Sequence, residues 1–451
     1  MCGRRSWNLG RKAQPMQEPA AAKEQPDAPS TPKTSRDSPE MSHRRSRSAR
    51  IRVRVLMLAV AIAGLAVGGM VLRMRSPASL QALAREIQGA VRTGEWSQLR
   101  KQLSAVPWGS KSSGSDAFRM AQRALLGGRI DAALAALEQI PDSDPLAARA
   151  RLLAGQLERQ RSHARQAEAM LLEAVRLNPR LVQARRELAF LYGIQGRRDD
   201  LNAQFKTLAR LIPLDLNAVF LWTNSSEEIL DNVANRPALE GFLTADPEDR
   251  WSRLALARVF LNSEELDACE RVLEPLPLSD HEALALRARL ELKRARVGEL
   301  EKLLELGPRD HPILARLRGL WAMQRKDLPT AIEQFQTAVR LDPTNREATE
   351  GLARALLASG RLREGDLYQK QAQRLRVLAD LLAEQFENLQ RGRRDPTLPR
   401  RLGFACEDVG RVDEAQACFR LALEIDPADA EVLRALDRLH PRGETDPRRR
   451  G

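Results

Sequence analysis

Apolar residues recur at helical spacing along most of the chain, and residues 317–343 show the pattern most clearly. Leu317 and Trp321 lie on one apolar stripe, and Phe335 and Val339 lie on a second stripe beyond a short polar turn. This spacing predicts two amphipathic helices, which we call helix A and helix B. Because one such hairpin cannot bury its apolar faces alone, the pattern predicts further copies of it.

The landmarks of this stretch do recur elsewhere. Ala338, Phe335, Ala331 and Gly319 lie 5, 8, 12 and 24 positions before Pro343. The same residue types stand at the same distances before Pro427 and, with leucine in place of phenylalanine, before Pro179. Four prolines follow one another at intervals of 34 residues: Pro145, Pro179, Pro213 and Pro247. A period held over this length predicts a repeat protein.

This pattern resembles the tetratricopeptide repeat, through the small residues, the large apolar residue and the proline just described. In that family the small residues let helix A and helix B approach closely, and the proline ends helix B. The resemblance implies an all-α fold, a right-handed α-solenoid of helix-turn-helix repeats over residues 114–440. The units that match best are 148–181, 182–215, 312–345 and 396–429, and the others are degenerate.

One interruption of the period lies between Pro343 and Pro427. These prolines are 84 residues apart, and two units would take 68. The excess falls in residues 362–391, which keep apolar residues at helical spacing and contain no proline. We expect one long helix here, or two helices with a tight bend. Such an insertion either projects to bind a partner or folds back as extra packing.

Residues 1–54 have a different composition from the rest. They are rich in Pro, Ser, Gln, Glu, Ala and Lys, with few large apolar residues, so we expect a disordered tail. Six arginines between residues 44 and 54 admit a nucleic-acid-binding interpretation of this tail. However, residues 1–75 carry ten of the thirteen net positive charges, which leaves the repeats close to neutral. We therefore expect no nucleic-acid partner.

Residues 55–72 form a run of eighteen residues without a charge. As a helix the run spans about 27 Å, close to the thickness of the bilayer core, which predicts a single transmembrane helix before the repeats. The excess of arginine on its N-terminal side predicts a cytoplasmic tail, with the repeats on the far side, in a periplasm or an equivalent space. A cleaved signal peptide and a buried core helix are the alternatives. Gly64 and Gly68 have the spacing of a helix-dimer motif, so a homodimer through this segment is a further hypothesis.

Residues 79–110 repeat the helix-turn-helix pattern without the full set of landmarks. They predict an atypical hairpin that caps the array, because a solenoid needs an end unit. The last residues, 441–451, are short and polar, which predicts a frayed tail.

The sequence contains no catalytic signature. It has no glycine-rich phosphate loop, no HExxH, no GxSxG and no CxxC, and its five histidines are scattered singly. We therefore expect no enzyme activity, no cofactor and no metal site. Cys406 and Cys418 fall on helices A and B of one unit, where they either pack as small apolar residues or form a disulfide.

The resemblance places any partner-binding surface on the concave face, which helix A lines in this family. The positions of this predicted partner face are Arg149, Arg186, Phe190, Phe220, Arg258, Arg316, Leu320, Arg354, Arg400 and Phe404. Arginine and aromatic residues are enriched at protein interfaces, and arginine favours an acidic partner segment. We expect a membrane-anchored, non-catalytic scaffold or adaptor for protein partners. The alternative is an accessory subunit of a membrane enzyme or of a secretion or envelope-assembly complex, in which the repeats act mainly as a spacer.

Overall fold

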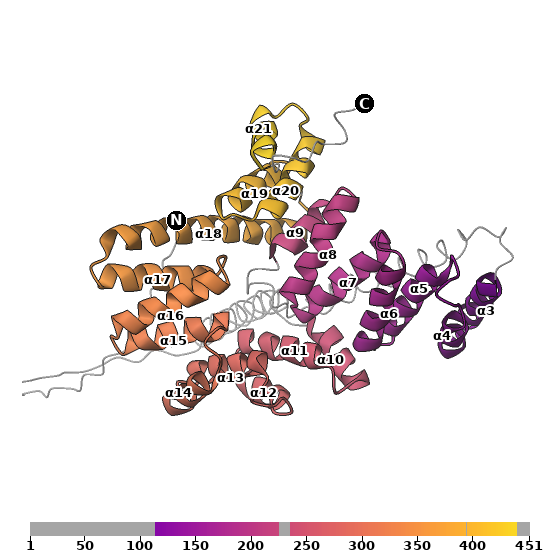
Figure 1. The fold of residues 1–451 in the computed structure, drawn as a ribbon, viewed down its shortest axis with the longest axis horizontal. Coiled ribbons are helices and arrows are strands. Elements are labelled where there is room, and N and C mark those ends of the chain that lie inside the picture. Colours follow the sequence, from indigo (N-terminus) through magenta and orange to yellow (C-terminus); the bar gives the residue numbers. More distant parts are fainter. Residues whose placement is uncertain (1–112, 225–234, 394, 440–451) are drawn as a thin grey trace, which may run out of the picture. The chain divides into compact units, whose positions relative to one another are not determined.

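The computed structural model describes residues 113–224, 235–393 and 395–439, in which every regular element is a helix (Figure 1). The all-α prediction is thereby confirmed for these residues. The first helices are α3 (Ser113–Leu126), α4 (Ile130–Glu138), α5 (Ala147–Gln160), α6 (Ala164–Leu177), α7 (Val182–Gln195), α8 (Arg198–Leu211), α9 (Leu216–Asn224), α10 (Arg236–Ala245), α11 (Arg250–Asn262) and α12 (Leu266–Leu273). The later helices are α13 (His281–Lys293), α14 (Val297–Leu306), α15 (Pro312–Gln324), α16 (Leu328–Leu341), α17 (Arg346–Ala358), α18 (Leu362–Gln390), α19 (Leu398–Asp408), α20 (Val412–Ile425) and α21 (Ala430–Leu439).

Most of these helices form hairpins with the next helix in the chain. The pairs α5 with α6, α7 with α8, α15 with α16 and α19 with α20 each make one repeat (Figure 1). Local sequence fixes where the helices begin and end. Asp327 caps the start of α16 by accepting a hydrogen bond from the Thr330 N–H at 3.2 Å. Gly196 ends α7 in the left-handed conformation, at φ 62°, which glycine adopts without strain.

The helices within a repeat touch at the small residues that mark the period. A Cβ atom added to Gly319 in α15 would lie 2.8 Å from the ring of Phe335 in α16. The matching distance from Gly403 to the ring of Phe419 is 2.4 Å, and both rings are fully buried. The helices approach this closely because the glycines carry no side chain. The large apolar residue of helix B then fills the space that the glycine leaves.

An arginine in helix A repeatedly binds the end of the preceding helix B. Arg287 donates to the carbonyl oxygens of Leu273 and Leu276, both at 2.6 Å. Arg318 of α15 and Arg151 of α5 make equivalent contacts, with the acceptors always 14 and 11 residues earlier. The last carbonyls of a helix lack partners within it, so these side chains satisfy groups that would otherwise be buried without a hydrogen bond.

Helix α9 leaves the regular stack. In a regular array the next helix A after α7 would begin near residue 216, but α11 packs against α7 in that place. Gln195 at the end of α7 donates to Ser252 Oγ of α11 at 3.1 Å, which fixes this contact. Helix α9 instead packs against α18 and α20, and its buried side chains share an apolar cluster with those helices (Figure 1).

The interruption of the period is a single long helix. Helix α18 has 29 residues and buries one stripe of its surface, which includes Leu375, Leu378 and Leu382. It packs against α17 at its start and against α19 later. This apolar stripe packs against the repeats. In contrast, Leu362 and Leu367 at the start of the helix are each 65% exposed.

Several predictions fall on residues that the structure does not describe. The tail at 1–54, the span at 55–72, the capping hairpin at 79–110 and the tail at 441–451 all lie outside the described residues. Among the helices that are described, none combines the length with the apolar character that crossing a membrane requires.

Replacing Gly319 by alanine tests the close contact within a repeat. The added methyl group meets the Phe335 ring at 2.8 Å, so either the ring or the helix must move. We expect Gly319→Ala to lower the free energy of unfolding by about 1–3 kcal/mol, measured by urea denaturation. Gly298→Ala in α14 is the matched control, because nothing lies within 4 Å of its added Cβ. Equal effects of the two substitutions would contradict the packing role of Gly319.

Candidate functional site

Four residues of the predicted partner face are exposed to solvent. They are Arg149 on α5, Arg186 and Phe190 on α7, and Arg354 on α17. Phe190 is 42% exposed, although Leu188, Leu191 and Tyr192 of the same helix are buried. These four side chains are available to a partner as the protein stands.

Three other residues of the predicted face pack inside the array. Phe220 on α9 is 7% exposed and belongs to the cluster that α9 forms with α18 and α20. Arg316 on α15 is 4% exposed and forms an ion pair with Glu347 of α17. Leu320 is partly buried between the apolar clusters of neighbouring repeats. In this arrangement these side chains hold neighbouring helices together.

The remaining three residues of the predicted face are Arg258, Arg400 and Phe404. Their side chains are partly exposed to solvent. Arg258 of α11 donates from Nη1 to the carbonyl oxygens of Gln195 and Gly196, at 3.3 and 3.2 Å. Arg400 of α19 donates from Nε to Asp429 Oδ2 at 2.9 Å, and its guanidinium lies 5.0 Å from the centre of the Phe404 ring. Both arginines therefore have structural contacts that a partner would have to share.

Residues of α5 and α7 hold the Phe190 ring in place. The guanidinium of Arg159 on α5 lies 5.2 Å from the centre of the Phe190 ring, a cation–π contact between neighbouring A helices. Glu187 fixes that guanidinium by accepting from Arg159 Nε at 3.1 Å. Its other carboxylate oxygen accepts from the amides of Gln156 and Gln183, at 2.8 and 3.1 Å. We call the surface made by Arg186 and Phe190, with Arg159 against the Phe190 ring, the α7 patch.

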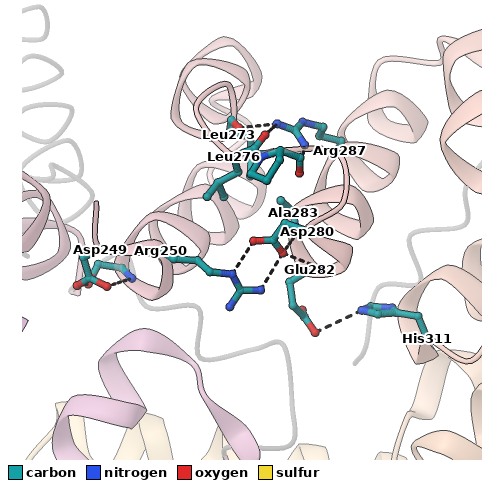
Figure 2. A network of polar contacts seen from close by, with 11 residues as sticks. Asp249, Arg250, Leu273, Leu276, Asp280, Glu282, Ala283, Arg287 and His311 are labelled. Carbon is teal, nitrogen blue, oxygen red and sulfur yellow. Dashed lines mark hydrogen bonds and ion pairs between the residues drawn. The ribbon is translucent and has the colours of Figure 1, made fainter. Parts of the chain in front are cut away.

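A second polar network joins the starts of α11, α13 and α15 (Figure 2). Arg250 forms a two-point ion pair with Asp280, with its Nε 2.5 Å from Oδ2 and its Nη2 2.8 Å from Oδ1. Asp280 also caps α13, because it accepts from the backbone N–H groups of Glu282 and Ala283. Glu282 Oε1 lies 3.3 Å from Nε2 of His311, which caps α15 through its other ring nitrogen.

Hydrogen bonds within this network stabilise the ionised forms of Asp280 and Glu282. Burial by itself would raise the pKa of Asp280, but the hydrogen bonds from Arg250 and from the backbone lower it overall. The hydrogen bond with His311 is the chief cause that lowers the pKa of Glu282. Both carboxylates are therefore ionised at neutral pH and suited to bind cations or N–H donors.

The cysteines of the described region are buried free thiols. They are Cys269, Cys406 and Cys418, so Cys406 and Cys418 pack in the core and are not bonded to each other. Burial raises the pKa of Cys269 to about 12, which keeps its thiol protonated and unreactive. Within the residues that the structure describes, no group of His, Cys, Asp and Glu side chains could hold a metal ion.

Sequence reasoning missed the pairs that support these surfaces. Arg159 and Glu187 are 28 residues apart, and Arg250 and Asp280 are 30 apart. Arg400 and Asp429 show a similar separation of 29. Opposite charges separated by a little less than one repeat are a signal that could have identified these pairs, since such residues lie on neighbouring A helices.

Comparison with known families agrees with the helical hairpins of the fold. Two family models, both described as tetratricopeptide repeat, match residues 118–182 and 316–373 in one case and 401–429 in the other. These segments coincide with hairpins α3–α6, α15–α18 and α19–α20. The chain contains tetratricopeptide repeats. The resemblance found in the sequence is confirmed for these segments, and no curated protein sequence matches the chain at a significant level.

Solved structures that resemble the chain include other tetratricopeptide repeat proteins. One is from Parabacteroides merdae, with 16% identity, 54% of this chain and 99% of that chain covered, and a TM-score of 0.29. The P58(IPK) TPR domain has 15% identity, coverage of 73% and 97%, and a TM-score of 0.29. The Cut9–Hcn1 assembly of the APC/C has 15% identity, coverage of 86% and 95%, and a TM-score of 0.31.

Changing Asp280 separates its role as a helix cap from its role as a charge. An asparagine side chain keeps a capping oxygen, so Asp280→Asn should cost less than Asp280→Ala, for which we expect a loss of about 1–2 kcal/mol. Because folding lowers the pKa of Asp280, its ionic contribution is present above its ordinary value of 3.8 and is lost as the pH falls through the lower, folded value.

The measurement is urea denaturation of the wild type and both variants between pH 3 and pH 7. The stability difference between the wild type and Asp280→Asn should shrink as the pH falls below about 4. A difference that is constant over this range would show that the carboxylate charge contributes nothing.

Proposed function

We propose that this protein is a non-catalytic scaffold that binds a protein partner through the A-helix surface of its tetratricopeptide repeats, centred on the α7 patch. Proteins built from this repeat generally act as interaction scaffolds, because their stacked helices form extended binding surfaces. The observation that carries the proposal is the exposure of Phe190, whose ring lies against the guanidinium of Arg159 that Glu187 holds.

The chemistry of the α7 patch favours a particular partner segment. Phe190 offers an apolar ring, and Arg186 next to it on α7 is exposed. Because Arg159 is already held by Glu187, its contact with the ring costs no further ordering when a partner binds. An acidic segment with an apolar or aromatic side chain would meet the ring and Arg186 together.

We also propose that residues 55–72 anchor this scaffold in a membrane, with residues 1–54 in the cytoplasm and the repeats on the other side. The uncharged run of eighteen residues and the arginines before it support this arrangement. The repeats would then face partners in a periplasm or an equivalent space. Dimerisation through Gly64 and Gly68 is a further part of this proposal.

Charge reversal at the centre of the α7 patch tests the binding surface. We expect Arg186→Glu to lower recovery of the partner about 10- to 100-fold in affinity capture from detergent-solubilised membranes, quantified by mass spectrometry. Phe190→Ala should lower recovery of the same protein. Arg271→Glu on α12 is the matched control, since it reverses an exposed arginine away from the A helices and should change recovery no more than about twofold.

The same affinity capture distinguishes a binding role of the repeats from a role as a spacer. If recovery is the same for Arg186→Glu and for the control, but is lost when residues 1–54 are deleted, the tail selects the partner and the repeats act as a spacer.

Alkaline extraction tests the proposed anchor. The full chain should stay in the membrane pellet after carbonate treatment, whereas a chain lacking residues 1–75 should be released. Protease added to the cytoplasmic side should remove the N-terminal tail and leave the repeats intact. Release of the full chain by carbonate would exclude a transmembrane helix. Pelleted repeats that the protease digests would reverse the proposed orientation.

A further inference from the structure

Helix α9 is buried partly by α18 and α20, which lie far from it along the chain. Its residues Val219 and Trp222 are fully buried in a cluster that also contains Ala417 and Cys418 of α20. Trp222 stacks on Phe205 of α8, with ring centres 5.7 Å apart. The burial of α9 thus joins α8 on one side to α20 on the other, across about 190 residues of sequence.

A buried arginine completes this contact. Arg411, directly before α20, is 6% exposed, and its Nη1 donates to the carbonyl oxygen of Thr223 at 2.6 Å. Nη2 lies 3.4 Å from the carbonyl oxygen of Trp222. These carbonyls belong to the last turn of α9 that the structure describes. Glu414 accepts from the same guanidinium, from Nε at 3.2 Å and from Nη2 at 3.1 Å.

Arg411 and the last turn of α9 satisfy each other's buried polar groups. A buried ion pair is favourable only while its remaining hydrogen-bond donors are satisfied, and here the end of α9 satisfies them. If α9 moves away, water replaces the carbonyls at Arg411, and the apolar side chains of α9 and α20 become exposed. The neighbouring pair Lys206–Asp413, at 3.1 Å, is on the surface and contributes little by itself.

We propose that α9 is a clasp that closes the array by docking its C-terminal end on Arg411, and that the protein exchanges between this closed state and an open one. The place beside α7 that α9 would take in a regular array is filled by α11, so α9 has no second site within the stack. Opening would expose Phe220, a residue of the predicted partner face that the closed state covers. The clasp therefore determines how much of that face a partner can reach.

Hydrogen–deuterium exchange of the full chain, kept in mild detergent because residues 55–72 are apolar, tests the clasp without a partner. We expect Arg411→Met to raise exchange in residues 216–224 about 10- to 100-fold, because charged hydrogen bonds to the end of α9 are lost. Arg434→Met on α21 is the control, since it removes an exposed arginine from the same end of the array. It should leave exchange in α9 unchanged.

Equal exchange of α9 in the wild type and in Arg411→Met, with α19 and α20 still protected, would overturn the proposal. If Arg411→Met unfolds α19 and α20, a charge exchange decides instead. Lys206→Glu places two carboxylates side by side between α8 and α20, so their repulsion should then speed exchange in α9, and adding Asp413→Lys should restore it. Failure of Asp413→Lys to restore the exchange rate that Lys206→Glu raises would overturn the proposal. None of these outcomes depends on the α7 patch, so the clasp and the proposed function fail separately.

Discussion

The rest of the structure depends on the close approach of two helices within each repeat. Gly319 and Gly403 let the rings of Phe335 and Phe419 reach the backbone of helix A, and both rings are fully buried. A helix with one apolar stripe gains stability only when that stripe is covered, so each hairpin must also lean on its neighbours. A stack of hairpins follows from this, and a long surface of helix A side chains follows from the stack.

Arginine has a structural role in this stack as well as a proposed binding role. Arg287 and Arg318 cap the ends of preceding helices, while Arg250 and Arg400 pair with acidic residues at the starts of neighbouring A helices. The guanidinium group of an arginine is planar and has several N–H donors. It can therefore form hydrogen bonds to carbonyls and carboxylates that packing has partly removed from water. An arginine-rich helix A therefore indicates binding only where the side chain, like that of Arg186, remains exposed.

The clasp at Arg411 arises from one irregularity of the stack. Because α11 takes the position beside α7, α9 is released from the stack and docks on α18 and α20. The long helix α18 is part of that docking surface, which gives the 29-residue insertion a packing role. A proposed partner surface on α7 and a proposed closing contact at α9 thus lie on elements that are close together in the chain.

The sequence by itself determined the helices, the period and the repeat family, because each repeat is built from contacts between residues close in the chain. It also identified Phe190 and Arg186 as candidates. It did not separate them from Phe220 and Arg316, which have the same residue types on other A helices and are buried. Only the tertiary structure decided this, since the exposure of a helix A residue depends on which distant helix covers it. Neither the displacement of α9 nor the contact of Arg411 with its carbonyls has a local signal, because both join segments nearly 190 residues apart.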